Sequence, residues 1–325
     1  MTATKAKAKG EETGPTLRQQ ESRAGLALLS PTFVVVMAVV VIPILWTIFI
    51  AFRELRLRDL REVGFFGAGF TLENFIGVFT SRGFFDALLT TLIYSVVGTT
   101  LAIGLGLAAA LIVRAPFRGR TLVRASMLLP YVSPVVAVAF VWSVMLDPNL
   151  GVVNAFGEDV LGWERAIPFL SQRSADVTIF GISLGLPVAL LSVIAFQAWR
   201  YFPFAFLFIL ARLQAVPADL DEAGKVDGAS PLQRFRYILL PQLSNVIALL
   251  AVLRFIWTFN EFDDIYLLTG GGAGTEVVSI GIYNRLTGRG DIGAAAAFSL
   301  VLAGLLAIFL FIYFRFFAKN AETSA

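Results

Sequence analysis

The chain has 325 residues, of which 57% are hydrophobic and only 15% charged, whereas a soluble domain carries about 25% charged residues. It contains no cysteine and no histidine, which excludes disulfides, thiolate chemistry, Ser-His-Asp triads and every metal site that needs imidazole or thiolate. The formal net charge of +3 is small, and nothing in the sequence indicates a nucleic-acid partner. We therefore expect neither a bound metal nor a nucleic acid.

Charged residues fall in islands, and the uncharged runs between them are long; the run from Ala24 to Phe52 carries no charge. A helix needs about 20 apolar residues to cross the hydrocarbon core. Backbone groups in lipid must be satisfied within their own segment, so these runs are helices. The sequence predicts an all-α, polytopic membrane protein with six transmembrane helices, at 27–52, 87–113, 123–146, 187–212, 243–262 and 293–317.

Pro43 and Pro134 lie inside predicted spans and are expected to kink them. Gly104 and Gly106 put small residues on the second span, where they permit close helix contact. The bulk of the chain, 27–317, is thus predicted to form one transmembrane domain.

The two ends of the chain are predicted to be cytoplasmic tails. The first 23 residues are polar, contain two glycines and a proline, and show no apolar periodicity, which is typical of a disordered tail, and we place this tail at 1–26. The apolar run that follows is too long for a signal peptide, so we expect an uncleaved first span. Residues 318–325 form a short second tail.

Lysine and arginine counts set the orientation. With the N-terminus inside, the cytoplasmic segments hold 15 and the outer loops 9. The short loop from Arg114 to Arg120 carries no acid and is the clearest inside marker, although the first outer loop holds five arginines. Both termini are therefore predicted to be cytoplasmic.

The fourth span follows an apolar stretch, Val177 to Leu186, that Gly181 and Gly185 interrupt. We interpret this stretch as an interfacial segment that leads into the span. Arg200 then falls near the membrane centre, where a charge is costly and is expected to face the bundle interior or a water-filled cavity. The alternative is an arginine that snorkels toward the membrane surface.

The loop at 217–241 is predicted to form two short helices joined by a turn. Pro217 suits the first position of a helix, and Gly228 suits the left-handed residue that ends one. Ser230 can cap the next helix, which we expect to stop before Pro241, where the fifth span begins. A helix–turn–helix against a membrane face is either a docking surface or an ordinary structured loop.

The fifth span carries Arg254, Trp257, Asn260 and Glu261. Arg254, Trp257 and Glu261 are spaced i, i+3, i+7 and so share one helical face. Because charges within a span usually mark a pathway or a pair, this face either lines a central solute path or holds a structural ion pair between Arg254 and an acid on another helix. Trp257, Phe259 and Tyr266 are similarly either solute contacts or packing residues.

The cytoplasmic loop resembles the EAA loop of ABC importer permeases, in which Glu-Ala-Ala is followed by a glycine and later by Ile-x-Leu-Pro. Gly224 departs from that pattern, because alanine is usual there, and glycine lowers helix stability by about 1 kcal/mol relative to alanine. The resemblance implies that this loop is a coupling helix that sits in a cleft of an ATPase subunit. The positions that carry it are Glu222, Ala223, Gly224, Asp227, Gly228, Ala229, Ile238, Leu240 and Pro241.

Further stretches resemble the sugar branch of this family, the maltose-permease and glycerol-phosphate-permease type. They are Ser30-Pro31, Leu72 to Phe75, Asn260 to Asp263, and Thr269 to Gly272, after which Ala273 stands where proline is frequent. The resemblance extends over nearly all of 27–317 but not over the outer segment 147–186.

The resemblance implies a set of partners in a bacterial plasma membrane: two copies of an ATP-binding ABC subunit, a second homologous permease, an extracytoplasmic solute-binding protein, a sugar-like solute and membrane lipid. The chain has no Gly-x-x-x-x-Gly-Lys-[Ser/Thr] motif, so we expect no cofactor in it and ATP in the partner subunit. The glycine-rich stretch from Gly270 to Gly274 lacks the lysine and is predicted to be a turn.

Two other functions fit parts of the sequence. A single-chain secondary transporter could use Arg200, Arg254 and Glu261 for coupled ions, but such folds are usually built from internal repeats, and we see none. A membrane enzyme would need clustered catalytic carboxylates, and only Glu261, Asp263 and Asp264 form such a cluster. Co-purification with a soluble ATPase would separate the permease from both.

Overall fold

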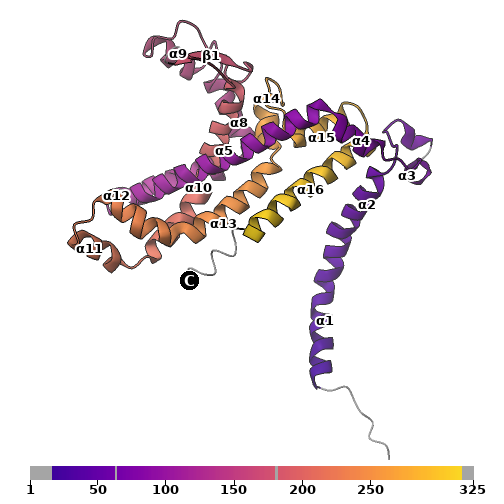
Figure 1. Cartoon of the computed structure of the whole chain (residues 1–325), viewed down its shortest axis with the longest axis horizontal. Coiled ribbons are helices and arrows are strands. Elements are labelled where there is room, and N and C mark those ends of the chain that lie inside the picture. Colours follow the sequence, from indigo (N-terminus) through magenta and orange to yellow (C-terminus); the bar gives the residue numbers. More distant parts are fainter. Residues whose placement is uncertain (1–16, 63, 180–181, 317–325) are drawn as a thin grey trace, which may run out of the picture.

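A computed structural model describes residues 17–62, 64–179 and 182–316. Among these residues, five helices are long and apolar enough to cross a membrane, and a sixth crossing is formed if one sharply bent helix pair is counted as a span. The long helices run between two ends of the molecule (Figure 1). One end carries α11 (Ala218–Val226) and α12 (Pro231–Arg234), and the other carries α4 (Glu73–Thr80), α14 (Asp263–Thr269) and α15 (Val278–Thr287).

The centre of the bundle is the contact between α5 (Arg82–Ile112) and α10 (Val188–Ala215), with α13 (Leu240–Phe259) packed against both. Gly106 permits this contact, because a Cβ placed on it would lie 2.7 Å from the Ala205 Cβ and 2.7 Å from the Phe206 amide nitrogen. Small residues allow helix backbones to approach closely in a membrane. The prediction for Gly106 is confirmed, whereas a Cβ on Gly104 would meet open space, so that part of the prediction is wrong.

Gly106→Leu is therefore expected to force α5 and α10 apart and to lower the free energy of unfolding by about 1–3 kcal/mol, the usual effect of overpacking. Gly104→Leu, two residues away on the same helix, is the matched control and is expected to change it little. Unfolding of the purified protein in mixed detergent micelles measures both. Equal effects of the two substitutions would contradict the assignment of Gly106 to the contact.

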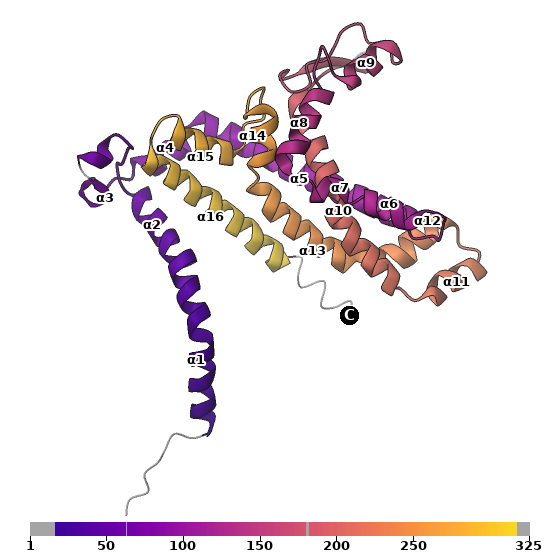
Figure 2. The ribbon, with the colours of Figure 1, turned by 180° about the vertical axis from the view of Figure 1, so that it is seen from behind.

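The first span consists of α1 (Leu17–Val36), a π-helical turn η1 (Met37–Val41) and α2 (Ile42–Ala51). The helix begins at Leu17, whereas its apolar span begins at Gly25. The prediction of a disordered tail to residue 26 is therefore wrong for 17–26, where leucine, arginine, glutamine and glutamate favour helix. This span stands apart from the other long helices in both views (Figure 2). In its most apolar stretch 6% of the residues are buried, against 28–56% in the other four single-helix spans.

A π turn lies directly before each of two prolines, Pro43 and Pro241. In η1 the Ile42 amide donates to the Met37 carbonyl, just before Pro43, and in η3 (Phe235–Leu239) the Leu240 amide donates to the Phe235 carbonyl, just before Pro241. Proline lacks an N–H and clashes with the carbonyl four residues earlier, and the wider π turn accommodates both effects. The prediction that the helix stops before Pro241 is therefore wrong: α12, η3 and α13 form one continuous helix from Pro231 to Phe259.

The third crossing is broken instead of kinked. It consists of α6 (Arg120–Ser126), α7 (Leu129–Val132) and α8 (Val135–Met145), and the axis turns by 96° between Val132 and Val135. The break falls at Ser133, whose φ and ψ of −74° and 144° are extended. A residue before proline avoids the helical region, so Pro134 ends α7 one residue before itself.

The outer segment between the third and fourth spans contains α9 (Val152–Asp159) and an antiparallel hairpin of β1 (Ala175–Ile179) and β2 (Ile182–Leu186). The interfacial segment predicted for Val177 to Leu186 is thus a hairpin that pairs Val177 with Leu184, and its β-branched residues suit strands. Buried Asn154 ties α9 to the following loop, since its side chain donates to and accepts from the backbone of Ile167 at 3.0 and 2.7 Å.

The remaining elements are short, apart from the last span, α16 (Ile292–Phe316). A 3₁₀ turn η2 (Asp59–Arg61) and α3 (Gly64–Gly67) follow the first span. Asn74 on α4 donates to the carbonyls of Ala51 and Arg53 at 2.9 and 2.8 Å, which satisfies acceptors at the end of α2. The stretch from Leu72 to Phe75 therefore fixes α4 to the end of the first span.

Candidate functional site: a coupling loop and a buried polar cluster

The loop between α10 and α13 has the cap chemistry that its sequence predicts. Gly228 has a φ of +76°, its amide donates to Lys225 at 3.1 Å, and the Ala229 amide donates to Gly224 at 2.9 Å. These two bonds form a Schellman motif, which ends α11. Ser230 and Gln233 form a complete capping box that starts α12, with Pro231 at the first position. Pro217 is the cap residue before α11 rather than its first helical residue.

The two halves of this loop touch at Gly224. This residue is buried, and a Cβ on it would lie 2.8 Å from the Ile238 Cδ1 and 3.3 Å from the Arg234 Cγ. The departure from Glu-Ala-Ala at this position thus lets α11 lie close against η3. Glu222, Ala223 and Asp227 are exposed, whereas Leu240 and Pro241 are the first two residues of α13.

Apolar side chains of the same loop project outward. Val226 is 87% exposed and Tyr237 71% exposed, and Leu232 and Leu220 are exposed as well. Between the short helices lies a groove of about 320 Å³, lined by Asp227, Gly228, Ala229, Gln233, Tyr237 and Ile238. Exposed apolar residues around a structured groove are typical of an interaction surface.

A buried polar cluster crosses the bundle near the end that carries α14. Arg200 on α10 forms an ion pair with fully buried Asp264 on α14 and also donates to the Tyr201 hydroxyl at 2.9 Å. That hydroxyl donates to Glu261 at 3.3 Å. Arg200 therefore faces the bundle interior and does not snorkel. Burial and the nearby Glu261 raise the pKa of Asp264, while Arg200 opposes that shift.

Arg254 belongs to the same cluster but forms no ion pair among the described residues, so the predicted pairing with an acid on another helix is not observed. It is 1% exposed, lies 3.9 Å from the Tyr201 ring centroid in a cation–π contact, and donates to Thr258 at 3.1 Å. Gln197 donates to the same hydroxyl at 3.0 Å. The cluster therefore joins α10 to α14 by an ion pair, and α10 to α13 by a cation–π contact and a neutral hydrogen bond.

Trp257 and Asn260 lie at the surface beside this cluster. Trp257 is 44% exposed, and its ring lies 5.2 Å from that of Phe204, which in turn lies 6.0 Å from Tyr131. Asn260, at the end of α13, is exposed and donates to the Ile256 carbonyl at 2.8 Å. The predicted common face is thus divided: Arg254 is inside, Trp257 is exposed, and Glu261 is half-buried.

Sequence reasoning missed Tyr201, Thr258 and Gln197, and it considered Asp264 only as an enzymatic acid. The one usable signal was the adjacency of Tyr201 to Arg200, a polar pair inside an otherwise apolar span. Within the described part of the chain, no group of three or more acidic residues has the geometry to hold a metal ion.

Comparison with known proteins assigns these features to a family. Residues 102–321 match the family described as binding-protein-dependent transport system inner membrane component. The chain is 32% identical over 277 residues to the inner membrane ABC transporter permease protein YcjO of Escherichia coli, covering 85% of this chain and 88% of that protein. It is 32% identical over 308 residues to the trehalose/maltose transport system permease protein MalF of Thermococcus litoralis, covering 92% and 95%.

A solved structure shares the fold. The bacterial alginate ABC transporter in complex with alginate pentasaccharide-bound periplasmic protein contains a chain that superimposes with a TM-score of 0.73 at 22% identity, over 91% of this chain and 95% of that one. The family and sequence matches, rather than the shared fold, favour a permease over a secondary transporter or a membrane enzyme. The chain belongs to the binding-protein-dependent transport system inner membrane component family, whose members are the membrane permeases of ABC importers.

Proposed function

We propose that this permease translocates a sugar or sugar-like solute, and that the aromatic row of exposed Trp257, partly buried Phe204 and exposed Tyr131 lies on its path. The observation that carries the proposal is this row, whose side chains come from α13, α10 and α7 and which contacts the buried polar cluster at Tyr201. Aromatic faces offer apolar contact to sugar rings, and Asn260 and Glu261 offer hydrogen bonds to hydroxyls. The trehalose/maltose function of the Thermococcus relative supports the same class of solute.

The path is tested by Trp257→Ala and Asn260→Ala. Loss of the aromatic contact is expected to lower solute uptake roughly three- to tenfold, the kinetic equivalent of one aromatic pair. Assembly and basal ATPase activity should stay near wild type, because both side chains are exposed. Phe140→Ala, which removes an exposed aromatic of α8 outside the row, is the control. Unchanged uptake in both test variants would show that the fifth-span face is packing surface.

The coupling loop, formed by 217–241, is the proposed docking site for an ATP-binding subunit, two copies of which would supply the energy. The exposed apolar residues Val226, Leu232 and Tyr237 support this assignment, since Tyr237 lines the groove and the other two adjoin its lining residues in sequence. Bound nucleotide then belongs to the partner, and this chain needs no cofactor. Closure of the ATP-binding subunits would move the loop and, through the continuous helix from Pro231 to Phe259, the solute path.

A second homologous permease is proposed to pack between the first span and the rest of the bundle. The first span is the least buried of the single-helix spans and stands apart from the others in both views. A solute-binding protein would deliver the solute at the opposite end from the coupling loop, where α4, α14 and α15 lie.

The proposed location is a bacterial plasma membrane, with both termini cytoplasmic. The lysine and arginine bias and the acid-free loop from Arg114 to Arg120 support this orientation. Reporter fusions at Phe117 and Glu322 should both give a cytoplasmic signal, and a periplasmic signal at either site would reverse the assignment.

A further inference from the structure

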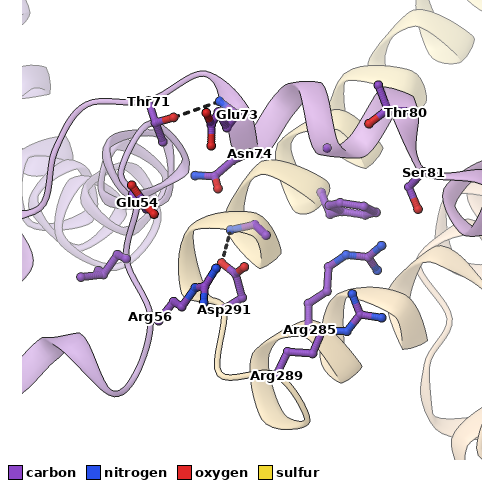
Figure 3. A pocket seen from close by; sticks show the side chains of 14 residues that line it. Glu54, Arg56, Thr71, Glu73, Asn74, Thr80, Ser81, Arg285, Arg289 and Asp291 are labelled. Atoms are coloured by element: carbon purple, nitrogen blue, oxygen red, sulfur yellow. Dashed lines mark hydrogen bonds between the residues drawn. The ribbon is translucent and has the colours of Figure 1, made fainter.

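A polar pocket of about 400 Å³ lies at the end of the bundle opposite the coupling loop (Figure 3). Its walls come from points where spans begin or end: Glu54 follows α2, Ser81 directly precedes α5, and Asp291 directly precedes α16. In a membrane, the ends of spans lie at the depth of the lipid headgroups. The pocket is therefore placed at the headgroup level of one leaflet.

One wall of the pocket is positive. Arg285 lies in the last turn of α15 and Arg289 two residues beyond its end, and within the described part of the chain neither forms an ion pair. Arg285 lies 3.4 Å from the Phe298 ring centroid and donates to the Gly281 carbonyl at 3.0 Å, which fixes its guanidinium in place. Burial lowers the pKa of Arg285 and the like charge of Arg289 lowers it further, so an anion between the two would relieve their repulsion.

The other wall is negative. Glu54 and Glu73 line it, with Thr71, and they lie across the pocket from the two arginines in Figure 3. Neither glutamate forms an ion pair in the described chain, whereas Asp291 is occupied, since it accepts from the Ala294 amide at 3.0 Å. Arg56 also lines the pocket and lies beside Asp291 in Figure 3. Apart from these two, the pocket presents Arg285 and Arg289 on one side and Glu54 and Glu73 on the other.

Apolar surface adjoins this pocket. Gly77 and Thr80 of α4 line it, and the neighbouring Ile76 and Phe79 are each 57% exposed. Because α4 lies at the headgroup level, these two side chains face either lipid or another protein. A ligand with a dipolar head and an apolar tail matches the two arginines, the two glutamates and the adjoining apolar surface.

We propose that this pocket binds the headgroup of phosphatidylethanolamine, with the phosphate between Arg285 and Arg289 and the ammonium on Glu54 and Glu73. Arginine binds phosphate through paired charge-assisted hydrogen bonds. A primary ammonium has three N–H donors for the glutamates, whereas the quaternary ammonium of phosphatidylcholine has none. The acyl chains would lie along Ile76 and Phe79.

The test is a lipid titration of the delipidated full-length protein, with native mass spectrometry as the readout. We expect phosphatidylethanolamine to bind roughly tenfold more tightly than phosphatidylcholine of the same acyl chains, because charged hydrogen bonds are lost in the second lipid. Glu73→Gln should remove this preference, and Arg289→Gln should weaken the binding of both lipids. Both residues are exposed, so the variants should fold. Arg58→Gln, an exposed arginine of the same outer loop that does not line the pocket, is the matched control and should bind like wild type.

Three results would overturn the proposal. One is equal binding of the two lipids to the wild-type protein. Another is tighter binding of phosphatidylglycerol in Glu73→Gln than in wild type, together with no ethanolamine preference, which would mark a simple anion site. The third is unchanged lipid binding in Arg289→Gln and Glu73→Gln with weaker binding of the solute-binding protein, which would make the pocket a protein-docking surface.

Discussion

Gly228→Pro is expected to reduce solute uptake at least about tenfold while the protein still inserts into the membrane. Gly228 has a φ of +76°, and its amide donates to the Lys225 carbonyl. Proline cannot adopt a positive φ and has no N–H to donate, so we expect the substitution to destabilise this turn by about 3 kcal/mol or more. The turn between α11 and α12 should then open and displace the exposed apolar side chains that the ATP-binding subunit would contact. Uptake and ATPase activity measured together in proteoliposomes should show hydrolysis no longer linked to transport.

Gly228→Asn is the matched control for this change. Asparagine tolerates the left-handed region and keeps the N–H, so this variant is expected to transport at near wild-type rates. Normal uptake by Gly228→Pro, or equal losses in both variants, would contradict a coupling role for the turn.

Asp264→Ala is expected to lower the free energy of unfolding by about 3–5 kcal/mol, the usual effect of leaving one charge of a buried pair without its partner. Asp264 is fully buried, and the Arg200 side chain is 14% exposed. The loss should exceed that of a simple cavity, because Arg200 would keep only the Tyr201 hydroxyl as a partner among the described contacts. Unfolding in mixed micelles of detergent and sodium dodecyl sulfate measures this change in the free energy of unfolding.

The surface pair Arg58–Asp59 supplies the control. Its nitrogen and oxygen are 3.2 Å apart, but the arginine side chain is 74% exposed, so Asp59→Ala is expected to cost about 0–1 kcal/mol. If Asp264→Ala and Asp59→Ala destabilised the protein equally, the polar cluster would not be the interior link between α10 and α14 that the structure indicates.

Local chemistry explains which parts of the fold were predictable. Span positions follow from hydropathy alone, and the turn at Gly228 and the cap at Ser230 follow from residues within a few positions of each other. The consequences of proline were harder to predict. A π turn lies just before Pro43 and Pro241, whereas the helix before Pro134 breaks and its axis turns by 96°, so the same residue type has two different outcomes in this chain.

The polar cluster was only half predictable for a related reason. A charge inside an apolar run is visible in the sequence, so Arg200 and Arg254 could be singled out. Their partners could not, because Asp264 lies beyond the next span and Tyr201 resembles any other aromatic of a membrane helix. Likewise, the pocket between α4 and α15 joins residues more than 200 positions apart, and no local pattern marks it.

The most direct test of the central claim is uptake by proteoliposomes that hold this chain with its second permease and ATP-binding subunits. Labelled trehalose and maltotriose are supplied outside with the solute-binding protein, with or without ATP inside. We expect accumulation of a sugar that needs both ATP and the binding protein and that ionophores do not abolish. Sugar uptake by this chain alone, driven by an ion gradient and indifferent to ATP, would contradict the account.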